Sequence, residues 1–448
     1  MQSGEERPRW YEGLTAAHWV VLAVASAGWV FDVYEGQLFT IFKTPMLKEL
    51  TGGDAAAIDW EGNLGLAAFL LGGAAGGLFF SVLGDRYGRV RVMAYTILVY
   101  SIFSALTYFA QSTTQVLVLR FLVALGAGGE WAVAAALVAE TFPARFRASA
   151  SGIFHASSVL GTALAALTGV ILSDPAKWRW AFLVGLAPSL LVLWIRVGIR
   201  EPDRWVKAVK STDDALGDDA IGTAATGTIA ESSPKPAAPA LGDLRELFGI
   251  EPWRTRALLG LALATVGLAT FWGIFAWSPE LIRLILGDTV PQSQRGEMAS
   301  QTYLIMNCTG GLLGLLSFAP LASWRGRRFA FAVYHIGAAI VAPLAFLWAN
   351  TYVQTTCLLT LMAFFVLGMH AGYAIYFPEL FPTRLRATGS SVCFNLGRVL
   401  GALILIVRGR LGAVLGLRHA VVAMSGLFLV GLVILIFAPE TRGHELPD

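Results

Sequence analysis

Long apolar stretches, interrupted by short polar segments, extend along almost the whole chain. Each is about as long as the ~20 mostly apolar residues that a helix needs to cross a bilayer. We expect spans at 16–41, 61–83, 92–110, 114–139, 149–172, 179–198, 257–286, 299–321, 329–349, 352–377, 387–407 and 417–437. The pattern therefore predicts an all-α membrane protein with twelve transmembrane helices.

The composition excludes an ordinary soluble enzyme. Only 14% of the 448 residues are charged, whereas soluble globular proteins have about 25%. The 33 basic and 30 acidic residues balance too closely for nucleic-acid binding. Cys308, Cys357 and Cys393 lie in apolar runs without metal-ligand spacing, so we expect neither a metal nor a cofactor.

Basic residues gather in the loops of one predicted side. The short loops of that side hold ten arginines: Arg86, Arg89, Arg91, Arg145, Arg147, Arg325, Arg327, Arg328, Arg384 and Arg386. Cytoplasmic loops carry an excess of Lys and Arg. We therefore expect a multi-pass protein of the inner (cell) membrane with both termini in the cytoplasm.

A polar segment divides the spans into six and six. We expect an N-terminal half at 1–199, a cytoplasmic linker at 200–256 and a C-terminal half at 257–448. Within the linker, 211–240 lacks aromatic residues and apolar periodicity, which predicts disorder. Residues 241–248 place leucines and a phenylalanine at helical spacing, which predicts an amphipathic helix along the membrane surface.

The two halves repeat each other. The segment 140–152 matches 379–391 at an offset of 239, and the turn around Gly88 has an echo around Gly326. Parallel repeats with a site between them are typical of secondary transporters. In the second span, Gly72, Gly73, Gly76 and Gly77 form two overlapping GxxxG pairs, which favour close helix packing.

These motifs resemble the major facilitator superfamily over nearly the whole chain. GDRYGRVRV (84–92) resembles the superfamily's loop between the second and third helices, although the second copy has Ser323 in place of the aspartate. The fourth span, REPDRW (200–205) and PETRG (439–443) resemble sugar-porter signatures. The resemblance implies alternating access, gated by salt bridges at the cytoplasmic side among Asp85, Arg89, Glu140, Arg147, Glu201, Arg204, Glu379, Arg386 and Glu440.

Two other segments point to a branch that carries acids. FDVYEGQLF in the first span and GGEW in the fourth resemble the aromatic-acid, metabolite and sialic-acid-type proton symporters. The seventh span, ALATVGLATFWGIFAW, lacks the amides that bind sugar hydroxyls in sugar porters. We expect proton-coupled symport of a small organic anion. The alternatives are a sugar or polyol porter and, less favoured, a transport-dead nutrient sensor.

An enzyme is the rival from another class. A membrane acyltransferase or glycosyltransferase would need a paired catalytic constellation at one membrane face. No His-x4-Asp, nucleophile elbow or Walker pattern occurs in the sequence. We expect a transporter, acting as a monomer in the lipid bilayer, with a small-molecule substrate and protons as its partners.

Ionisable residues within spans are functional candidates, because each costs about 2.5–3.5 kcal/mol or more at the bilayer centre. For proton coupling we single out Asp32, Glu35 and Glu130. Asp32 is the leading proton site, with a structural ion pair as its alternative, whereas Glu35 could lie at the outer boundary in contact with water. Glu130 is either a second titrating group or an acid tied to a neighbouring helix, and we favour the structural reading.

The candidate substrate-binding residues are Arg120, His155, Trp272, Phe275, His370, Tyr373, Asn395 and Arg398. Asn395 and Arg398, three apart, could together hold a carboxylate, or Arg398 could neutralise an acid of the first half. Arg120 could hold a substrate carboxylate, bias Asp32, or form a structural pair. Histidines in spans are more often core residues. Trp272 and Phe275 could share one helical face against a planar substrate, or face lipid.

Overall fold

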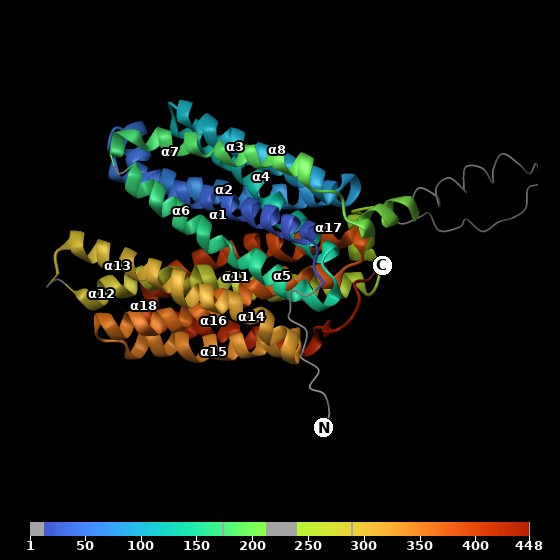
Figure 1. The fold of residues 1–448 in the computed structure, drawn as a ribbon. Coiled ribbons are helices and arrows are strands. Elements are labelled where there is room, and N and C mark those ends of the chain that lie inside the picture. Colours follow the sequence, from blue (N-terminus) through green and yellow to red (C-terminus); the bar gives the residue numbers. More distant parts are fainter. Residues whose placement is uncertain (1–12, 173, 212–239, 288–289, 448) are drawn as a thin grey trace, which may run out of the picture.

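The computed structural model describes residues 13–172, 174–211, 240–287 and 290–447. Two bundles of helices lie side by side, the first drawn in blue to green and the second in yellow to red (Figure 1). Across these ranges the regular structure is helical, without strands. The expectation of an all-α protein is therefore confirmed.

Among the described residues, the first bundle contains eight α-helices. They are α1 (Ala16–Leu50), α2 (Ala55–Tyr87), α3 (Arg89–Leu106), α4 (Thr113–Thr141), α5 (Ala144–Ala156), α6 (Ser158–Ile171), α7 (Trp178–Val184) and α8 (Leu190–Gly198). The fifth predicted span corresponds to α5 and α6 together. The sixth corresponds to α7 and α8, which a 3-10 turn at Ala187–Ser189 separates.

The second bundle follows the short helix α10 (Leu244–Gly249). Its helices are α11 (Trp253–Gly273), α12 (Ser278–Leu286), α13 (Gln292–Met306), α14 (Leu312–Arg325), α15 (Arg327–Trp348), α16 (Tyr352–Leu380), α17 (Arg386–Ser391) and α18 (Gly397–Phe437). A π-helix at Val392–Leu396 joins α17 to α18. Within α18 the backbone at Gly416 is not helical, with φ 72° and ψ 163°, and this break separates the helices of the last two predicted spans.

Most predicted spans are present as single long helical segments. Eleven segments of the described chain are long and apolar enough to cross a membrane. Large apolar side chains cover their outer surfaces, such as Val170 and Trp348, which are 73% and 75% exposed. An apolar perimeter suits contact with lipid rather than water.

The linker is only partly visible. Residues 212–239, most of the stretch expected to be disordered, lie outside the described residues. The expected amphipathic helix begins three residues later than the sequence pattern indicates, at Leu244, because the Asp243 side chain caps it by accepting from the N–H of Arg245 at 2.8 Å. Leu247 of this helix is buried against the protein.

Glycines allow a close approach of α2 and α4. A Cβ atom on Gly72 or Gly76 would lie 2.2 or 1.8 Å from the carbonyl oxygens of Phe121 and Leu125. Gly73 and Gly77 instead face the second bundle. The two overlapping GxxxG pairs therefore serve two different contacts, one within the first half and one between the halves.

The two bundles meet mainly near one end. There α5 packs against α14 and α16, and α17 packs against α2 and α4. Figure 1 shows α5 and α17 on the same side as the C-terminus. This end carries the turns with the ten arginines named above, and we call it the arginine-rich end.

Candidate functional site

The two acids of α1 are both buried. Asp32 is 6% exposed and Glu35 is fully buried. The Ser104 hydroxyl donates to Glu35 Oε2 at 2.5 Å, while Oε1 of Glu35 is buried without a partner in the described chain. The alternative that Glu35 lies in water at the outer boundary is therefore wrong.

Arg120 of α4 lies beside Glu35 rather than Asp32. Its guanidinium donates to the backbone oxygen of Glu35 at 3.3 Å, and it interacts electrostatically with that acid. The rings of Phe39 and Phe69 lie 4.5 and 4.4 Å from the guanidinium carbon. Enclosed by two aromatic rings and 1% exposed, Arg120 has the surroundings of a structural cation. The Arg120–Asp32 pairing considered from the sequence is not formed.

Glu130 of α4 is buried against α1. It is fully buried, and neither carboxyl oxygen has a hydrogen-bond partner among the residues the structure describes. A Cβ atom on Gly28 would lie 2.0 Å from its Oε1, so a side chain at Gly28 would displace the Glu130 carboxylate. Asp32 is near enough for electrostatic interaction. Glu130 thus packs against α1 without a hydrogen bond to a neighbouring helix among the described residues, and the choice between a structural and a titrating role stays a prediction.

Arg398 reaches Asp32 from the opposite half. It is half-buried at the start of α18, with its guanidinium carbon 5.0 Å from the Phe394 ring. It interacts electrostatically with Asp32, yet no hydrogen bond or ion pair of 4 Å or less joins it to any described residue. The sequence left two roles open for Arg398, binding a substrate carboxylate or neutralising an acid of the first half. The structure places it near such an acid, Asp32, but leaves its N–H donors without a partner among the described residues.

Asn395 lies one turn away and has different contacts. Its amide nitrogen donates to Ser391 Oγ at 3.0 Å and to the Gly128 carbonyl at 3.4 Å. The side chain also fills the space beside Gly77, where a Cβ atom would be 2.2 Å away. Because its amide donor is engaged between the halves, Asn395 does not present it beside Arg398 to a carboxylate. A role for Asn395 in substrate binding stays a prediction.

Aromatic rings also join the halves beside Arg398. Trp131 of α4 stacks on Phe394 with ring centroids 4.1 Å apart. Its indole N–H donates to Nδ1 of His155, on α5, at 3.2 Å. The GGEW motif drew attention to Trp131 only through resemblance. Phe394 carried no signal in the sequence, because which ring faces another across two halves depends on tertiary packing.

His370 and Tyr373 lie on α16. Nδ1 of His370 bonds to the Val366 carbonyl at 2.8 Å, and its Nε2 is buried without a partner in the described parts. The Tyr373 hydroxyl donates to the Leu263 carbonyl at 3.1 Å, which ties α16 to α11. A substrate contact remains a prediction for both residues, but in this structure Tyr373 has no free hydroxyl.

The expected aromatic face at Trp272 and Phe275 is not formed. Such a face would need a continuous α-helix, but α11 ends at Gly273 and a 3-10 turn begins at Phe275. Phe275 is instead fully buried, stacked on Phe271 at 5.0 Å and edge-on to Tyr303. Phe271 in turn touches His370, with centroids 5.4 Å apart.

At the arginine-rich end, a glutamate caps a helix in each half. The backbone N–H groups of Arg89, Val90 and Arg91 donate to the Glu201 carboxylate at 2.7 to 3.2 Å. Burial raises the pKa of this carboxyl, although the three N–H groups oppose the shift. Gly88 precedes the helix with φ 111°, and a Cβ atom there would lie 2.3 Å from Glu201.

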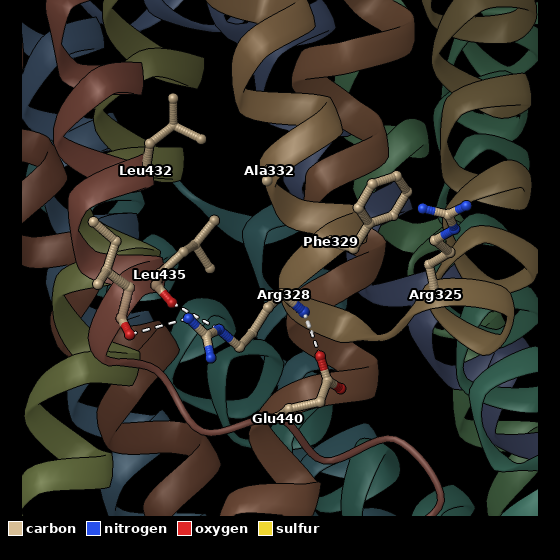
Figure 2. A pocket seen from close by; sticks show the side chains of 8 residues that line it. Arg325, Arg328, Phe329, Ala332, Leu432, Leu435 and Glu440 are labelled. Carbon is tan, nitrogen blue, oxygen red and sulfur yellow. Dashed lines mark hydrogen bonds between the residues drawn. The ribbon is translucent and has the colours of Figure 1, made fainter.

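The second half repeats the arrangement 238 to 239 residues later. Glu440 accepts from the N–H groups of Arg327 and Arg328 at 2.9 and 3.1 Å, next to Gly326 with φ 103°. Figure 2 shows Glu440 below Arg328, whose guanidinium donates to the last carbonyls of α18, those of Leu435 and Ile436, at 3.0 Å each. The repeat therefore preserves three-dimensional contacts.

Buried ion pairs extend from these turns. Arg89 contacts Asp85 at 2.9 Å and Glu140 at 2.8 Å, with all three side chains fully buried. Arg327 contacts Glu379 at 2.7 Å as the equivalent pair. Ser323, the counterpart of Asp85, is exposed.

Three contacts cross between the halves at this end. Arg386 donates to Glu140 at 2.8 Å, and Arg89 donates to the Thr383 carbonyl at 2.7 Å. Asp85 accepts from the first-turn N–H groups of α17, those of Ala387 and Thr388, and from the Thr388 hydroxyl at 2.6 Å.

The remaining members of the predicted charge set lie nearby. Arg147 donates to the Ala139 carbonyl at 3.0 Å and interacts electrostatically with Glu379. Arg204 pairs with Glu445 at 2.8 Å. All nine residues predicted to form the gate therefore lie at one end of the bundle, and their role in gating stays a prediction.

Two helical halves with buried charges between them and a repeated charge network at one end define a secondary transporter. The chain matches the family model described as Major Facilitator Superfamily over residues 19–405, and it belongs to that superfamily. Its relatives and its fold are those of transporters rather than enzymes. It is a multi-pass inner-membrane protein.

Known proteins support this assignment. The chain is 30% identical to a probable 4-methylmuconolactone transporter of Cupriavidus pinatubonensis, covering 98% of this chain and 94% of the relative. It is 29% identical to the niacin transporter NiaP of Acinetobacter baylyi, covering 96% and 95%. The solved proton:xylose symporter XylE superposes with a TM-score of 0.75 at 15% identity, covering 96% and 97%. The expected fold of twelve helices in two halves is confirmed.

Proposed function

We propose that the protein is a proton-coupled symporter that moves a small organic anion, a carboxylate, by alternating access. One observation carries the proposal. Arg398 brings a cation into the region between the halves, near Asp32, yet it forms no hydrogen bond with any described residue. A cation at membrane depth is costly unless it is paired, and a substrate carboxylate would supply that pairing.

The same geometry suggests how protons are coupled. Asp32 and a bound carboxylate would compete for Arg398, since both are anions in reach of one guanidinium. Protonation of Asp32 removes the competing charge, so the carboxylate and the proton bind together. Glu35 and Glu130, also buried on the first half, are the further candidates for proton transfer.

The relatives favour an acid over a sugar. The curated relatives are named for 4-methylmuconolactone and niacin, and niacin is a pyridine carboxylic acid. The likeness to the xylose symporter is a likeness of fold. A sugar or polyol porter remains the alternative that the experiment below distinguishes.

We infer that the arginine-rich end faces the cytoplasm, together with both termini, and that its ion pairs hold that end closed. The three contacts between the halves described above support this inference. Opening would have to break the bond of Glu140 with Arg386 and the bonds of Asp85 with α17. The charge set then works as a two-state element whose balance substrate and proton shift. We expect the monomer to be the transporting unit.

The test is uptake by purified protein in liposomes under an imposed inward proton gradient. Carboxylates and sugars are offered to wild type, Asp32→Asn and Arg398→Ala, with Arg410→Ala, an exposed arginine on the same helix, as the matched control. We expect acid uptake that Arg398→Ala abolishes, Asp32→Asn uncouples from the gradient and Arg410→Ala leaves intact. Uptake of sugars alone would overturn the organic-anion proposal, and concentrative uptake by Asp32→Asn would overturn the role of Asp32.

A further inference from the structure

Two histidines from opposite halves lie near Arg398 and are held in different protonation patterns. His155 belongs to α5 and His370 to α16, and they are 5% and 7% exposed. The Phe394 ring lies between them: it stacks on Trp131, which donates to His155, and it lies near Tyr373, whose ring contacts His370. Arg398 lies 5.0 Å from the same Phe394 ring and interacts electrostatically with both histidines. The Arg398 guanidinium and the two imidazole rings thus lie in the same region. The following contacts show which nitrogen carries the hydrogen in each neutral ring.

The contacts of His155 fix which nitrogen carries its hydrogen. Its Nδ1 receives the indole N–H of Trp131 at 3.2 Å. An indole nitrogen only donates, so Nδ1 of His155 is an acceptor and the ring hydrogen lies on Nε2. His155 therefore offers a hydrogen-bond donor.

The contacts of His370 fix the opposite pattern. Its Nδ1 lies 2.8 Å from the Val366 carbonyl oxygen, which only accepts. The hydrogen of the neutral ring is therefore on Nδ1, and Nε2 carries a free lone pair. That Nε2 atom is buried without a hydrogen-bond partner in the described chain. A buried acceptor without a partner is unfavourable, and a ligand held by Arg398 would be near enough to supply the donor.

From this arrangement we propose that the transported acid carries a second polar group, a hydroxyl or amino donor, and that His370 Nε2 accepts a hydrogen bond from it. His155 Nε2–H is placed to donate to an oxygen of the same molecule, and Arg398 binds the carboxylate. The inference rests on the proposed function and narrows its substrate class. His370 is then a specificity-determining residue.

His335 provides a matched control within the same half. Its Nδ1 also bonds to a backbone carbonyl, that of Phe331, at 2.8 Å, and its Nε2 is likewise buried without a partner in the described residues. It packs, however, against Gly431 and Phe428 of α18 rather than beside Arg398. A general effect of removing a buried histidine would appear at both positions.

The experiment compares acids that differ only in the donor. Liposome uptake is measured for propionate, benzoate, their hydroxy derivatives and the methyl ethers of those derivatives. We expect wild type to prefer a hydroxy acid over its methyl ether by roughly tenfold or more, as expected when a hydrogen bond to a buried acceptor is lost. His370→Phe reduces that preference to about twofold or less while uptake of the unsubstituted acid continues. His370→Gln, which keeps an acceptor oxygen, retains part of the preference, and His335→Phe leaves it unchanged.

Three results would overturn the inference. If wild type takes up hydroxy acids and their methyl ethers equally well, the substrate does not donate a hydrogen bond to His370. The proposed transport of organic anions would still stand. If His370→Phe lowers uptake of all acids equally and keeps the ratio, His370 is structural. If sugars are taken up and no carboxylate is, the proposed function fails, and this inference fails with it.

Discussion

Glu140 of the first half and Arg386 of the second form an ion pair of 2.8 Å in which neither side chain is exposed. The same carboxylate also receives Arg89 at 2.8 Å from its own half. One acid therefore serves two cations, and only one of the two bonds has to break when the halves separate. The acid keeps a partner in either state, which avoids leaving an unpaired buried charge.

Removing this acid should open the arginine-rich end. In Glu140→Gln the two arginines lose their shared counter-ion. Breaking a buried ion pair costs about 3–5 kcal/mol, and this cost destabilises the closed state, in which the pair forms. We expect a longer distance between spin labels at the exposed positions Tyr87 and Trp324, on opposite halves. Glu49→Gln, which breaks a solvent-exposed pair with Arg179, should leave the distance unchanged. An unchanged distance in Glu140→Gln would show that the pair does not hold the gate.

Anion binding should strengthen as pH falls. Protonation of Asp32 removes a negative charge that competes for Arg398, whereas a typical carboxylate substrate stays ionised above about pH 5.5. Other groups near Asp32 are Glu35 on its own helix, Glu130 on α4 and Tyr100 on α3. We expect the wild-type affinity for the anion, followed by tryptophan fluorescence, to decrease as the pH is raised from about 5.5.

Asp32→Asn should bind the anion with an affinity that does not change over the same range. A pH dependence preserved in this variant would move the titrating group to Glu35 or Glu130. Asp32→Asn combined with Glu130→Gln would then separate those two candidates.

The glycine contact between α2 and α4 should tolerate no side chain. Gly76→Ala places a Cβ atom 1.8 Å from the Leu125 carbonyl oxygen, so the helices must separate and lose packing along their length. Gly426→Ala is the control, because nothing lies within 4 Å of its Cβ position and alanine favours a helix by about 1 kcal/mol. We expect the melting temperature in detergent to fall by several degrees for Gly76→Ala only. Equal melting temperatures would mean that α2 and α4 adjust at no cost.

The turn before α3 should depend on Glu201 as well as on glycine geometry. Gly88 and Gly443 both have positive φ, at 111° and 74°, but only Gly88 has a Cβ position blocked, by Glu201. Gly443→Ala should cost only the backbone strain, about 1 kcal/mol. Gly88→Ala should cost more, because Glu201 must also leave the N–H groups it caps. Protease resistance and melting temperature measure both, and similar losses would argue against the capping role.

The sequence predicted which residues are equivalent better than which ones touch. Hydropathy located the spans, and the repeat placed Glu201 and Glu440 in matching positions, because both features depend on local pattern. The partner of each buried charged residue could not be predicted from the sequence, because it depends on how packing rotates each helix about its axis. Arg120 therefore lies beside Glu35, one turn from the acid considered, and donates to its backbone oxygen. Arg398 lies near Asp32 and beside Gly73, where a Cβ atom would be 3.3 Å from its guanidinium.

Breaks within helices were also missed. The run through Gly273 and Phe275 has no proline at the break itself, so it reads as one helix, and the aromatic face inferred from that continuity was wrong. The π-helix at Val392–Leu396 likewise has no composition that distinguishes it from an α-helix. Such features arise from tertiary packing and often mark functional sites.

The segment after α18 joins the contacts at the arginine-rich end. Glu445 pairs with Arg204, and the Pro447 carbonyl accepts from Arg386, the same arginine that bonds Glu140. A fluorescent protein or affinity tag fused directly behind these residues would pull on the contacts that link the halves. A reporter attached there would shift the equilibrium between the open and closed states that it is meant to measure. A tag at this position therefore needs a long flexible spacer.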